Sequence, residues 1–375
     1  MEKLPFNRPS MTGRELEYLT EAVNSSKLSG DGPFTERCHE WLEQTFESPA
    51  LLTHSCTGAL EMAAMLADLQ PGDEVILPSY TFVSTANAVV LRGAVPVFVD
   101  IRKDTLNLDE TLIEDAITPR TKAIIAVHYA GVCAEMDVIN DIASKHNLFV
   151  IEDAAQAMLS TYKGRLAGTL SDFSAFSFHE TKNILSGEGG ALIVNNRSYL
   201  ERAEILREKG TNRKKFFRGA TDKYTWVDIG SSYLPSELVA AYLFAQLETA
   251  QDVTKYRIEV CNRYRESFSE LSDEGLVGLP FCPENCVSNG HMFYIVLRTP
   301  GDRDRFIEKM SAEGVMTPFH YVPLHSSPAG TRFGKTHGSL ENTDVLSSRL
   351  VRLPVYYGVK EHQDRIIEAV RKFFA

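Results

Sequence analysis

Between residues 50 and 195, short apolar runs alternate with longer segments whose apolar residues recur at helical spacing. The short runs are rich in β-branched residues and predict strands, and the longer segments predict helices between them. Strands are expected at 74–77, 95–99, 123–127, 148–151, 173–178 and 191–194, and helices at 57–69, 82–91 and 135–146. This order predicts parallel βαβ units in an α/β fold, with a mostly parallel central sheet and helices on both faces.

The pattern changes after about residue 198. A helix at 199–209 precedes a loop at 210–232 that is rich in charged and aromatic residues, and a long helical region follows at 236–271, with Ser236 as its N-cap. The remainder mixes strands with helices, at 292–297, 315–319, 303–313 and 361–374. We therefore expect a large domain over 1–250, which includes the N-terminal segment, and a small α+β domain over 251–375, with the long helix crossing the boundary.

The composition is that of an ordinary globular protein, with 43% hydrophobic and 24% charged residues in a chain of 375. The hydrophobic fraction excludes a disordered chain, and no apolar run approaches the ~18 residues that a membrane helix requires. The formal net charge of -11 argues against a broad basic face. Nucleic acid and membranes are therefore not expected as partners.

The N-terminal sequence has no apolar core of signal-peptide length, and the 6 cysteines fit reduced thiols, so we expect a cytoplasmic protein. Cys282 and Cys286 form a C-x3-C pair, but no second pair follows. We therefore expect no metal site.

Two carboxylates, Glu152 and Asp153, follow the strand predicted at 148–151. Ligands of open α/β sheets bind outside the carboxyl ends of the strands, which places Asp153 where ligand chemistry occurs. A carboxylate in this position can also be a simple helix cap. Asp153 therefore indicates a ligand-binding site only in combination with other residues.

Ser177 lies in the strand predicted at 173–178, and Lys182 follows that strand. The glycine-rich stretch 187–190 lets its backbone approach neighbouring groups closely. A single lysine after a strand is usually a solvated surface residue. The combination with Asp153, however, suits pyridoxal phosphate (PLP). The PLP aldehyde requires a lysine for its Schiff base, and its ring nitrogen requires an anion to hold the proton that makes the ring an electron sink.

The phosphate of PLP requires donors, ideally at a helix N-terminus. Ser-Cys-Thr-Gly-Ala at 55–59 supplies such a place before an apolar helix. Thr57 alone can equally be an N-cap, but beside Lys182 and Asp153 phosphate binding is favoured. Two other phosphate-binding motifs are not present. No G-x-G-x-x-G follows a predicted strand, and Ala329 occupies the position of the first glycine of a nucleotide-triphosphate loop.

These segments together resemble the sugar aminotransferase family, whose members are fold-type-I PLP enzymes that aminate nucleotide-linked keto-sugars. The resemblance spans nearly the whole chain. The motifs that carry it, in order, are Pro-Ser-Tyr-Thr-Phe at 78–82, Val-His-Tyr-Ala-Gly at 127–131, Glu-Asp-Ala-Ala-Gln at 152–156, Ser-Phe-His-Glu-Thr-Lys at 177–182 and Gly-Glu-Gly-Gly at 187–190.

Further segments resemble one branch of that family, the dTDP-4-amino-4,6-dideoxygalactose transaminases of enterobacterial common antigen synthesis. They lie at 53–60, 208–213, 222–226, 230–233 and 319–325. The resemblance implies transfer of an amino group from L-glutamate to C4 of dTDP-4-keto-6-deoxyglucose by ping-pong chemistry.

Other functions stay open at this point. A transaminase that makes the gluco epimer or a 3-amino sugar would share these motifs, because sub-ångström placement of the sugar decides which face receives the proton. A PLP-binding sensor without turnover is disfavoured by Lys182 and by the lack of an appended DNA-binding domain. A related sugar dehydratase typically has His at this position, and a dehydrogenase would need the glycine fingerprint that is missing.

The resemblance also implies residue roles. Lys182 holds the cofactor and, once freed, moves the proton between sugar C4 and the cofactor. Asp153 pairs with the ring nitrogen, Gln156 contacts the ring hydroxyl and Phe82 stacks on the ring. The residues that correspond to phosphate contacts are Thr57, Gly58 and Ser177.

The family works as a homodimer with shared active sites, and an Asn reaches the neighbouring subunit's phosphate where this chain has the shorter Ser232. The basic run 207–218, with Arg213 and Arg218, could clamp a sugar-nucleotide diphosphate or be a solvated loop. His320 and His325 could contact the sugar or be structural.

Overall fold

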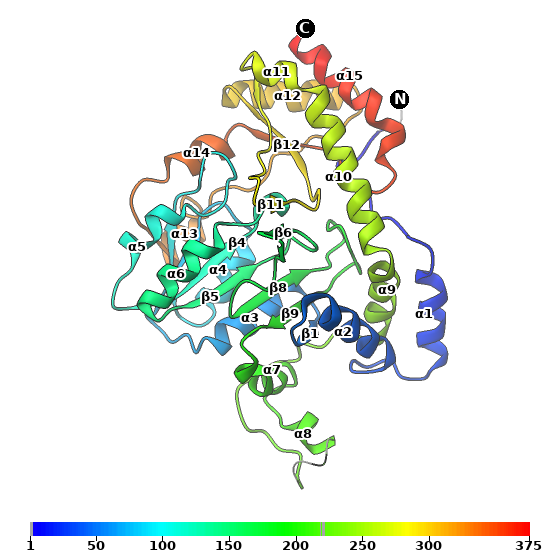
Figure 1. Cartoon of the computed structure of the whole chain (residues 1–375), viewed down its shortest axis with the longest axis vertical. Coiled ribbons are helices and arrows are strands. Elements are labelled where there is room, and N and C mark those ends of the chain that lie inside the picture. The colour runs from blue at the N-terminus through cyan, green and yellow to red at the C-terminus, as the bar shows by residue number, and fades with distance from the viewer. Residues whose placement is uncertain (1–2, 218, 220–221) are drawn as a thin grey trace.

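A central sheet organises the chain in the computed structural model, which describes residues 3–217, 219 and 222–375 (Figure 1). Over these residues the sheet has 8 strands in the order β1-β9-β8-β5-β4-β2-β3-β13. The strands are β1 (Ala50–Thr53), β2 (Glu74–Pro78), β3 (Val95–Val99), β4 (Thr121–Val127), β5 (Phe149–Asp153), β8 (Phe173–Ser177), β9 (Gly190–Val194) and β13 (Lys335–Thr336).

The strands from β8 to β13 pair in parallel, and β9 runs antiparallel to both of its neighbours, β8 and β1. The predicted mostly parallel sheet is thus confirmed. The strand expected at 191–194 is present but reversed, because no helix intervenes between β8 and β9 to return the chain for a parallel pairing.

Both faces of the sheet are covered by helices, because the strands are apolar on both sides. In β4, Ile124 and Ala126 contribute to one core and Ala123 and Ile125 to the other. The first core is covered by α2 (Pro33–Phe46), α6 (Met136–His146) and α9 (Glu237–Glu248), and the second by α3 (Cys56–Leu66), α4 (Val83–Val90) and α7 (Leu200–Arg207). The predicted α/β fold with helices on both faces is confirmed.

A separate apolar core lies in the C-terminal part of the chain. There, β10 (Val277–Gly278), β12 (Phe293–Leu297) and β14 (Leu350–Leu353) form an antiparallel sheet. The helices α10 (Ala250–Ser267), α12 (Pro300–Ala312) and α15 (Gln363–Phe374) pack on this core (Figure 1).

The remaining elements are short. A small sheet joins β6 (Thr161–Tyr162), β7 (Arg165–Leu166) and β11 (Cys286–Val287). The other helices are α1 (Glu15–Asn24), α5 (Ile113–Ala116), α8 (Arg213–Phe217), α11 (Ser269–Asp273), α13 (Pro328–Phe333) and α14 (Glu341–Ser347), with 3-10 turns at Glu110–Leu112, Tyr129–Gly131, Arg197–Tyr199 and Val359–His362. In the part of the chain that the structure describes, no helix combines the length and the apolar character needed to cross a membrane.

The helical region expected at 236–271 is present, but the expectation of one long helix across residue 250 is wrong. The region is divided into α9, α10 and α11, because Thr249 and Phe268 leave helical geometry, with φ of -112° and -114°. The strand expected at 315–319 is not formed. Its backbone instead makes single hydrogen bonds to two remote segments, because the Met316 N–H donates to the Leu4 carbonyl and the Pro318 carbonyl accepts from the Arg352 N–H. Tyr321, two residues beyond this segment, has a φ of 48°, outside the β region.

Candidate active site

A cavity of about 740 Å³ lies at the carboxyl ends of β5 and β8, between the large sheet and the C-terminal part of the chain. The first turns of α3 and α4, the segment 318–321 and β14 complete its walls. Residues singled out in the sequence meet there from distant segments. Those that line the cavity are Thr57, Phe82, Asp153, Gln156, Ser177, Lys182 and His320.

Other residues singled out in the sequence lie elsewhere in this single chain. Ser232 is exposed and bridges to Glu208, and Arg213 pairs with the same glutamate at 3.2 Å. His325 Nδ1 contacts Ser79 Oγ at 2.8 Å, outside the residues that line the cavity. The position of Arg218 falls outside the described residues.

Lys182 follows β8 in a tight turn, in which its N–H donates to the His179 carbonyl at 2.9 Å. Burial lowers the pKa of its amine, while the thiol of Cys56 and the carboxylate of Asp153 act in the opposite direction and Arg352 adds to the lowering. A neutral amine is therefore reached at lower pH than for a solvated lysine.

Asp153 is the last residue of β5 and is 5% exposed. Its Oδ2 accepts from the Thr85 hydroxyl at 2.7 Å, and its Oδ1 accepts from the Ala155 N–H at 3.2 Å. The Thr85 hydroxyl also lies 2.9 Å from that of Thr81. This chain of hydroxyls fixes the carboxylate in the cavity wall. Sequence reasoning missed Thr85, whose only signal is its place in the first turn of a helix after a strand.

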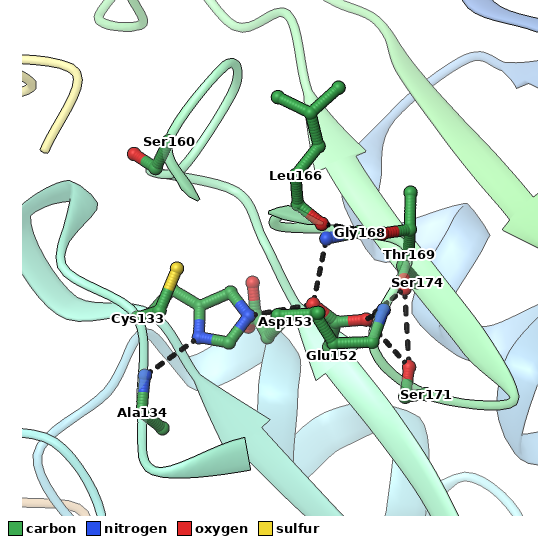
Figure 2. Close-up of polar contacts among 12 residues, drawn as sticks. Cys133, Ala134, Glu152, Asp153, Ser160, Leu166, Gly168, Thr169, Ser171 and Ser174 are labelled. Carbon is green, nitrogen blue, oxygen red and sulfur yellow. Dashed lines mark hydrogen bonds and ion pairs between the residues drawn. The ribbon is translucent and has the colours of Figure 1, made fainter. Parts of the chain in front are cut away.

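Glu152, the neighbour of Asp153, belongs to the opposite side of the strand and is fully buried (Figure 2). Its carboxylate accepts from the N–H groups of Gly168 and Leu170 and from the hydroxyls of Ser171 and Ser174, all at 2.7 to 2.9 Å. The second carboxylate of the pair thus has a structural network of its own.

The ring of His128 completes this network. Its Nδ1 accepts from the Ala134 N–H at 3.2 Å, so its proton lies on Nε2, 2.8 Å from Glu152 Oε2. Burial alone would raise the pKa of Glu152, but the His128 contact and the N–H donors of Gly168 and Leu170 lower it. The network ties the C-terminal ends of β4 and β5 to the 167–174 loop.

The N-terminus of α3 forms another wall of the cavity. Ser55 is its N-cap, and the serine hydroxyl accepts from the Gly58 N–H at 3.1 Å, so the alternative of Thr57 as N-cap is wrong. The Thr57 hydroxyl instead lies 2.7 Å from that of Ser84. A Cβ on Gly190 would lie 2.4 Å from the Cys56 nitrogen, so β9 can pass this close only because residue 190 is glycine.

An aromatic cluster lies opposite this helix terminus. The Tyr321 ring stacks on His320 with centroids 3.6 Å apart, and Gln156 Nε2 donates to the Tyr321 hydroxyl at 2.8 Å. His320 Nδ1 lies 2.8 Å from the Tyr129 hydroxyl, and burial holds the pKa of His320 well below its ordinary value. Phe82, 55% exposed, lies with its ring 6.2 Å from that of Tyr321. The motif at 319–325 thus contributes Tyr321, which sequence reasoning had not singled out.

The described part of the basic run, residues 207–217, does not line the cavity in this chain. Lys214 and Lys215 pair with Glu204 and Glu201 at 3.2 and 2.6 Å, so much of its charge is balanced locally by acids of α7. The helix α8 projects away from the body of the molecule (Figure 1). Trp226, which comes after α8 in the chain, is 77% exposed.

The two cysteines of the C-x3-C pair have different partners, and the Cys286 sulfur lies 3.9 Å from the Cys133 carbonyl oxygen. Cys282 Sγ lies 3.5 Å from the Cys286 carbonyl. Across the described residues, no group of three or more His, Cys, Asp or Glu side chains is arranged to hold a metal ion.

Similar proteins extend over the whole chain. The sequence pattern of the DegT/DnrJ/EryC1/StrS aminotransferase family matches residues 9–371. The spore coat polysaccharide biosynthesis protein SpsC of Bacillus subtilis is 33% identical, over 98% of this chain and 96% of its own. GDP-perosamine synthase of Escherichia coli O157:H7 is 31% identical over 100% of both chains. The structure of Spr1654 from Streptococcus pneumoniae in its PLP form has a TM-score of 0.91 at 25% identity, covering 99% of this chain and 98% of its own.

Proposed function

The chain belongs to the DegT/DnrJ/EryC1/StrS aminotransferase family, and from this premise we propose that it transfers an amino group from L-glutamate to C4 of dTDP-4-keto-6-deoxyglucose. Membership makes it a PLP-dependent sugar aminotransferase of fold type I. The product would be dTDP-4-amino-4,6-dideoxygalactose, a precursor of enterobacterial common antigen or a related surface polysaccharide. The observation that carries the proposal is the meeting of Lys182, Asp153 and the α3 N-terminus in one cavity.

The donor set of the cavity fits PLP. A buried amine, a carboxylate fixed by two hydrogen bonds and a helix N-terminus with nearby hydroxyls offer one partner for each polar part of the cofactor. Because residue 190 is glycine, β9 can lie directly against the N-terminus of α3. When bound, PLP supplies an aldehyde for the donor's amino group and a ring that stores electrons.

Lys182 would hold the cofactor and later move the proton at sugar C4. Its lowered pKa suits this role, because a general base works best when its pKa lies near the working pH. Asp153 would hold the proton on the ring nitrogen, and its bonds to Thr85 and Ala155 keep its orientation fixed.

The remaining cofactor contacts divide between phosphate and ring. Thr57, Gly58 and Ser177 would bind the phosphate, with the Gly58 N–H shared with the Ser55 hydroxyl. Phe82 would cover one face of the ring, since its side chain is largely exposed and lines the cavity. Gln156, held by Tyr321 and by the Ala130 N–H at 2.7 Å, would face the ring hydroxyl.

We propose further that two copies of the chain share their active sites. The helix α8 projects from the body (Figure 1). Farther along the chain, Tyr224, Trp226, Val227 and Ile229 are exposed apolar residues, and such a group marks an interaction surface. Ser232 and Arg213 would then reach the partner's cavity, where Ser232 contacts phosphate and Arg213 the sugar-nucleotide diphosphate. His320 would contact the sugar from within the same chain, because it lines the cavity, and His325 is proposed only as support for the loop that carries it.

Incubation with PLP, L-glutamate and dTDP-4-keto-6-deoxyglucose tests the function directly. We expect conversion, and nuclear magnetic resonance of the product should show an axial amino group at C4. An equatorial group would identify the gluco epimer, and amination at C3 would identify the other rival. The GDP-linked keto-sugar is the matched comparison, because GDP-perosamine synthase is similar over the whole chain. No conversion of any keto-sugar, with PLP bound, would favour a sensor.

A further inference from the structure

Buried polar side chains join the residue after Lys182 to the C-terminal part of the chain. Asn183, which directly follows the lysine, is 5% exposed. Its Nδ2 donates to the Asn289 carbonyl at 3.0 Å, and its Oδ1 lies 3.0 Å from Nδ1 of His291. Asn289 and His291 lie between β11 and β12. These two hydrogen bonds therefore tie the turn that carries Lys182 to a segment that is remote in the sequence.

The same hydrogen bonds decide which nitrogen of the His291 ring carries the proton. Because the Asn183 amide nitrogen already donates to Asn289, the atom that faces the ring is the amide oxygen, which can only accept. The proton therefore lies on Nδ1. Burial and nearby positive charges hold the pKa of His291 well below its ordinary value, so the ring stays neutral. Nε2 is thus an acceptor, and none of the described residues hydrogen-bonds to it.

The segment that carries His291 is itself held from two sides. Arg257 of α10 donates from Nη2 to the His291 carbonyl at 2.6 Å. The Asn289 side chain accepts from the His291 N–H at 3.0 Å and donates to the Gln156 carbonyl at 3.0 Å. A ring anchored in this way cannot follow a displaced Asn183, so it defines where that side chain lies.

The position of Asn183 bears directly on Lys182. The peptide unit between the two residues is planar, so fixing Asn183 limits the directions in which the lysine side chain can leave the backbone. The lysine stem is flexible and loses rotamer entropy when its amine is held at one place. A fixed starting point reduces that loss and keeps the amine at its reacting partner. His291 and Lys182 both line the cavity.

We propose that His291 is a positioning residue for Lys182 and acts through Asn183, because its Nδ1–H holds the turn from which the lysine reaches the cofactor. This inference rests on the proposed role of Lys182. A direct contact of Nε2 with a bound molecule would use the other edge of the same ring. The two edges can therefore be tested separately.

Asparagine and glutamine each keep one edge of the histidine ring. His291→Asn places its amide nitrogen near the position of Nδ1 and keeps a donor for Asn183, whereas His291→Gln places its amide near Nε2 and loses that donor. Asn183→Ala removes the acceptor. His39→Gln is the matched control, because this ring also accepts a hydrogen bond, from the Leu52 N–H at 2.9 Å, but does not line the cavity.

Two forms of the cofactor separate positioning of the lysine from general damage to the cavity. PLP added to the cofactor-free full chain reports bond formation with Lys182 through the absorption band of lysine-bound PLP, whereas pyridoxamine phosphate binds without that bond. His291→Gln and Asn183→Ala should each slow the appearance of the band about 5- to 30-fold, and the double variant should be no more than about twofold slower still. His291→Asn should stay within about threefold of the wild type. The dissociation constant of pyridoxamine phosphate should change less than about threefold in every variant.

Three results would overturn the inference. A His291→Asn variant as slow as His291→Gln, beside a normal Asn183→Ala, would assign Nε2 a direct contact instead. A loss of pyridoxamine phosphate affinity equal to the loss in rate would indicate damage to the whole cavity. An equally slow His39→Gln would indicate a general loss of structure.

The measurement survives two complications. If His291→Gln does not fold by circular dichroism, Asn183→Ala and His291→Asn carry the same test. Because no sugar is needed, a wild type that forms lysine-bound PLP but converts no keto-sugar would refute the proposed function, while the positioning role would still be decided by the rate of band formation.

Discussion

Replacing Glu152 with glutamine tests whether the network behind Asp153 stabilises the fold. The side chain is fully buried, and its two oxygens are within hydrogen-bond distance of five donors, among them residues drawn in Figure 2. Those donors are the N–H groups of Gly168 and Leu170, the hydroxyls of Ser171 and Ser174, and the His128 ring. Glutamine keeps the shape but replaces one accepting oxygen with an NH2 group.

The cost follows from which donors then lose their acceptor. With the NH2 group at the Oε1 position, the serine hydroxyls can rotate and accept, but the Leu170 N–H cannot. With the NH2 group at the Oε2 position, both the Gly168 N–H and the His128 Nε2–H would be left without an acceptor. One buried unsatisfied donor costs about 1–3 kcal/mol and the lost charge on the remaining bonds about 1 more, so we expect a loss of about 2–4 kcal/mol.

The pH dependence has a defined sign. The pKa of Glu152 is lowered in the folded protein, so its stabilisation is present above the ordinary carboxyl value of 4.5 and is lost as pH falls through the folded pKa. The difference in unfolding free energy between wild type and Glu152→Gln should therefore be largest at neutral pH and shrink in acid.

Urea unfolding followed by circular dichroism measures this difference, with the solvent-exposed Glu40→Gln as matched control. The control should change the unfolding free energy by less than about 0.5 kcal/mol. If Glu152→Gln behaves like the control at neutral pH, or if its deficit grows in acid, the reasoning about the network is wrong.

The other predictions concern the cavity. Lys182→Ala should abolish turnover and prevent the absorption band of lysine-bound PLP, and normal turnover would contradict its role. Asp153→Asn should lower the transamination rate at least about 100-fold, whereas Thr85→Val, which removes one hydrogen bond to the carboxylate, should lower it about 5- to 15-fold with PLP still bound; equal losses would show that Thr85 does more than orient Asp153. Gly190→Ala should weaken PLP affinity by more than about tenfold in equilibrium dialysis, because its Cβ would meet the Cys56 nitrogen at 2.4 Å.

The arrangement of the large sheet and most of its helices follows from local patterns. Short apolar runs between segments of helical periodicity predict β2, β3, β4 and β5. A strand that is buried on both faces has apolar residues at nearly every position, so its sequence is easily recognised. Ser236 was predictable as an N-cap for the same reason, because a serine before an apolar helical run has a local role. The break at Thr249 carries no such signal, because α9 and the beginning of α10 pack on the same core and only the later part of α10 packs on the C-terminal core.

The cavity was predictable only in part. Asp153 ends β5, Lys182 follows β8, and Thr57 lies in the first turn of the helix that follows β1. The rule that ligands bind at the carboxyl ends of strands therefore predicts, without coordinates, that the three residues lie near one another. Arg352 and Tyr321 come from segments remote in the chain, and nothing in their own neighbourhoods predicts a place beside Lys182.

The sequence by itself determined the α/β architecture and the cofactor class, and it singled out Lys182 as the candidate lysine, because hydrophobic periodicity and strand-end chemistry are local properties of the chain. Only the tertiary structure decided that Glu152 turns away from Asp153 into its own buried network, that the basic run pairs with α7, and that Arg352 lines the cavity. These are contacts between segments far apart in the chain, and their free energies depend on distances that no local pattern encodes.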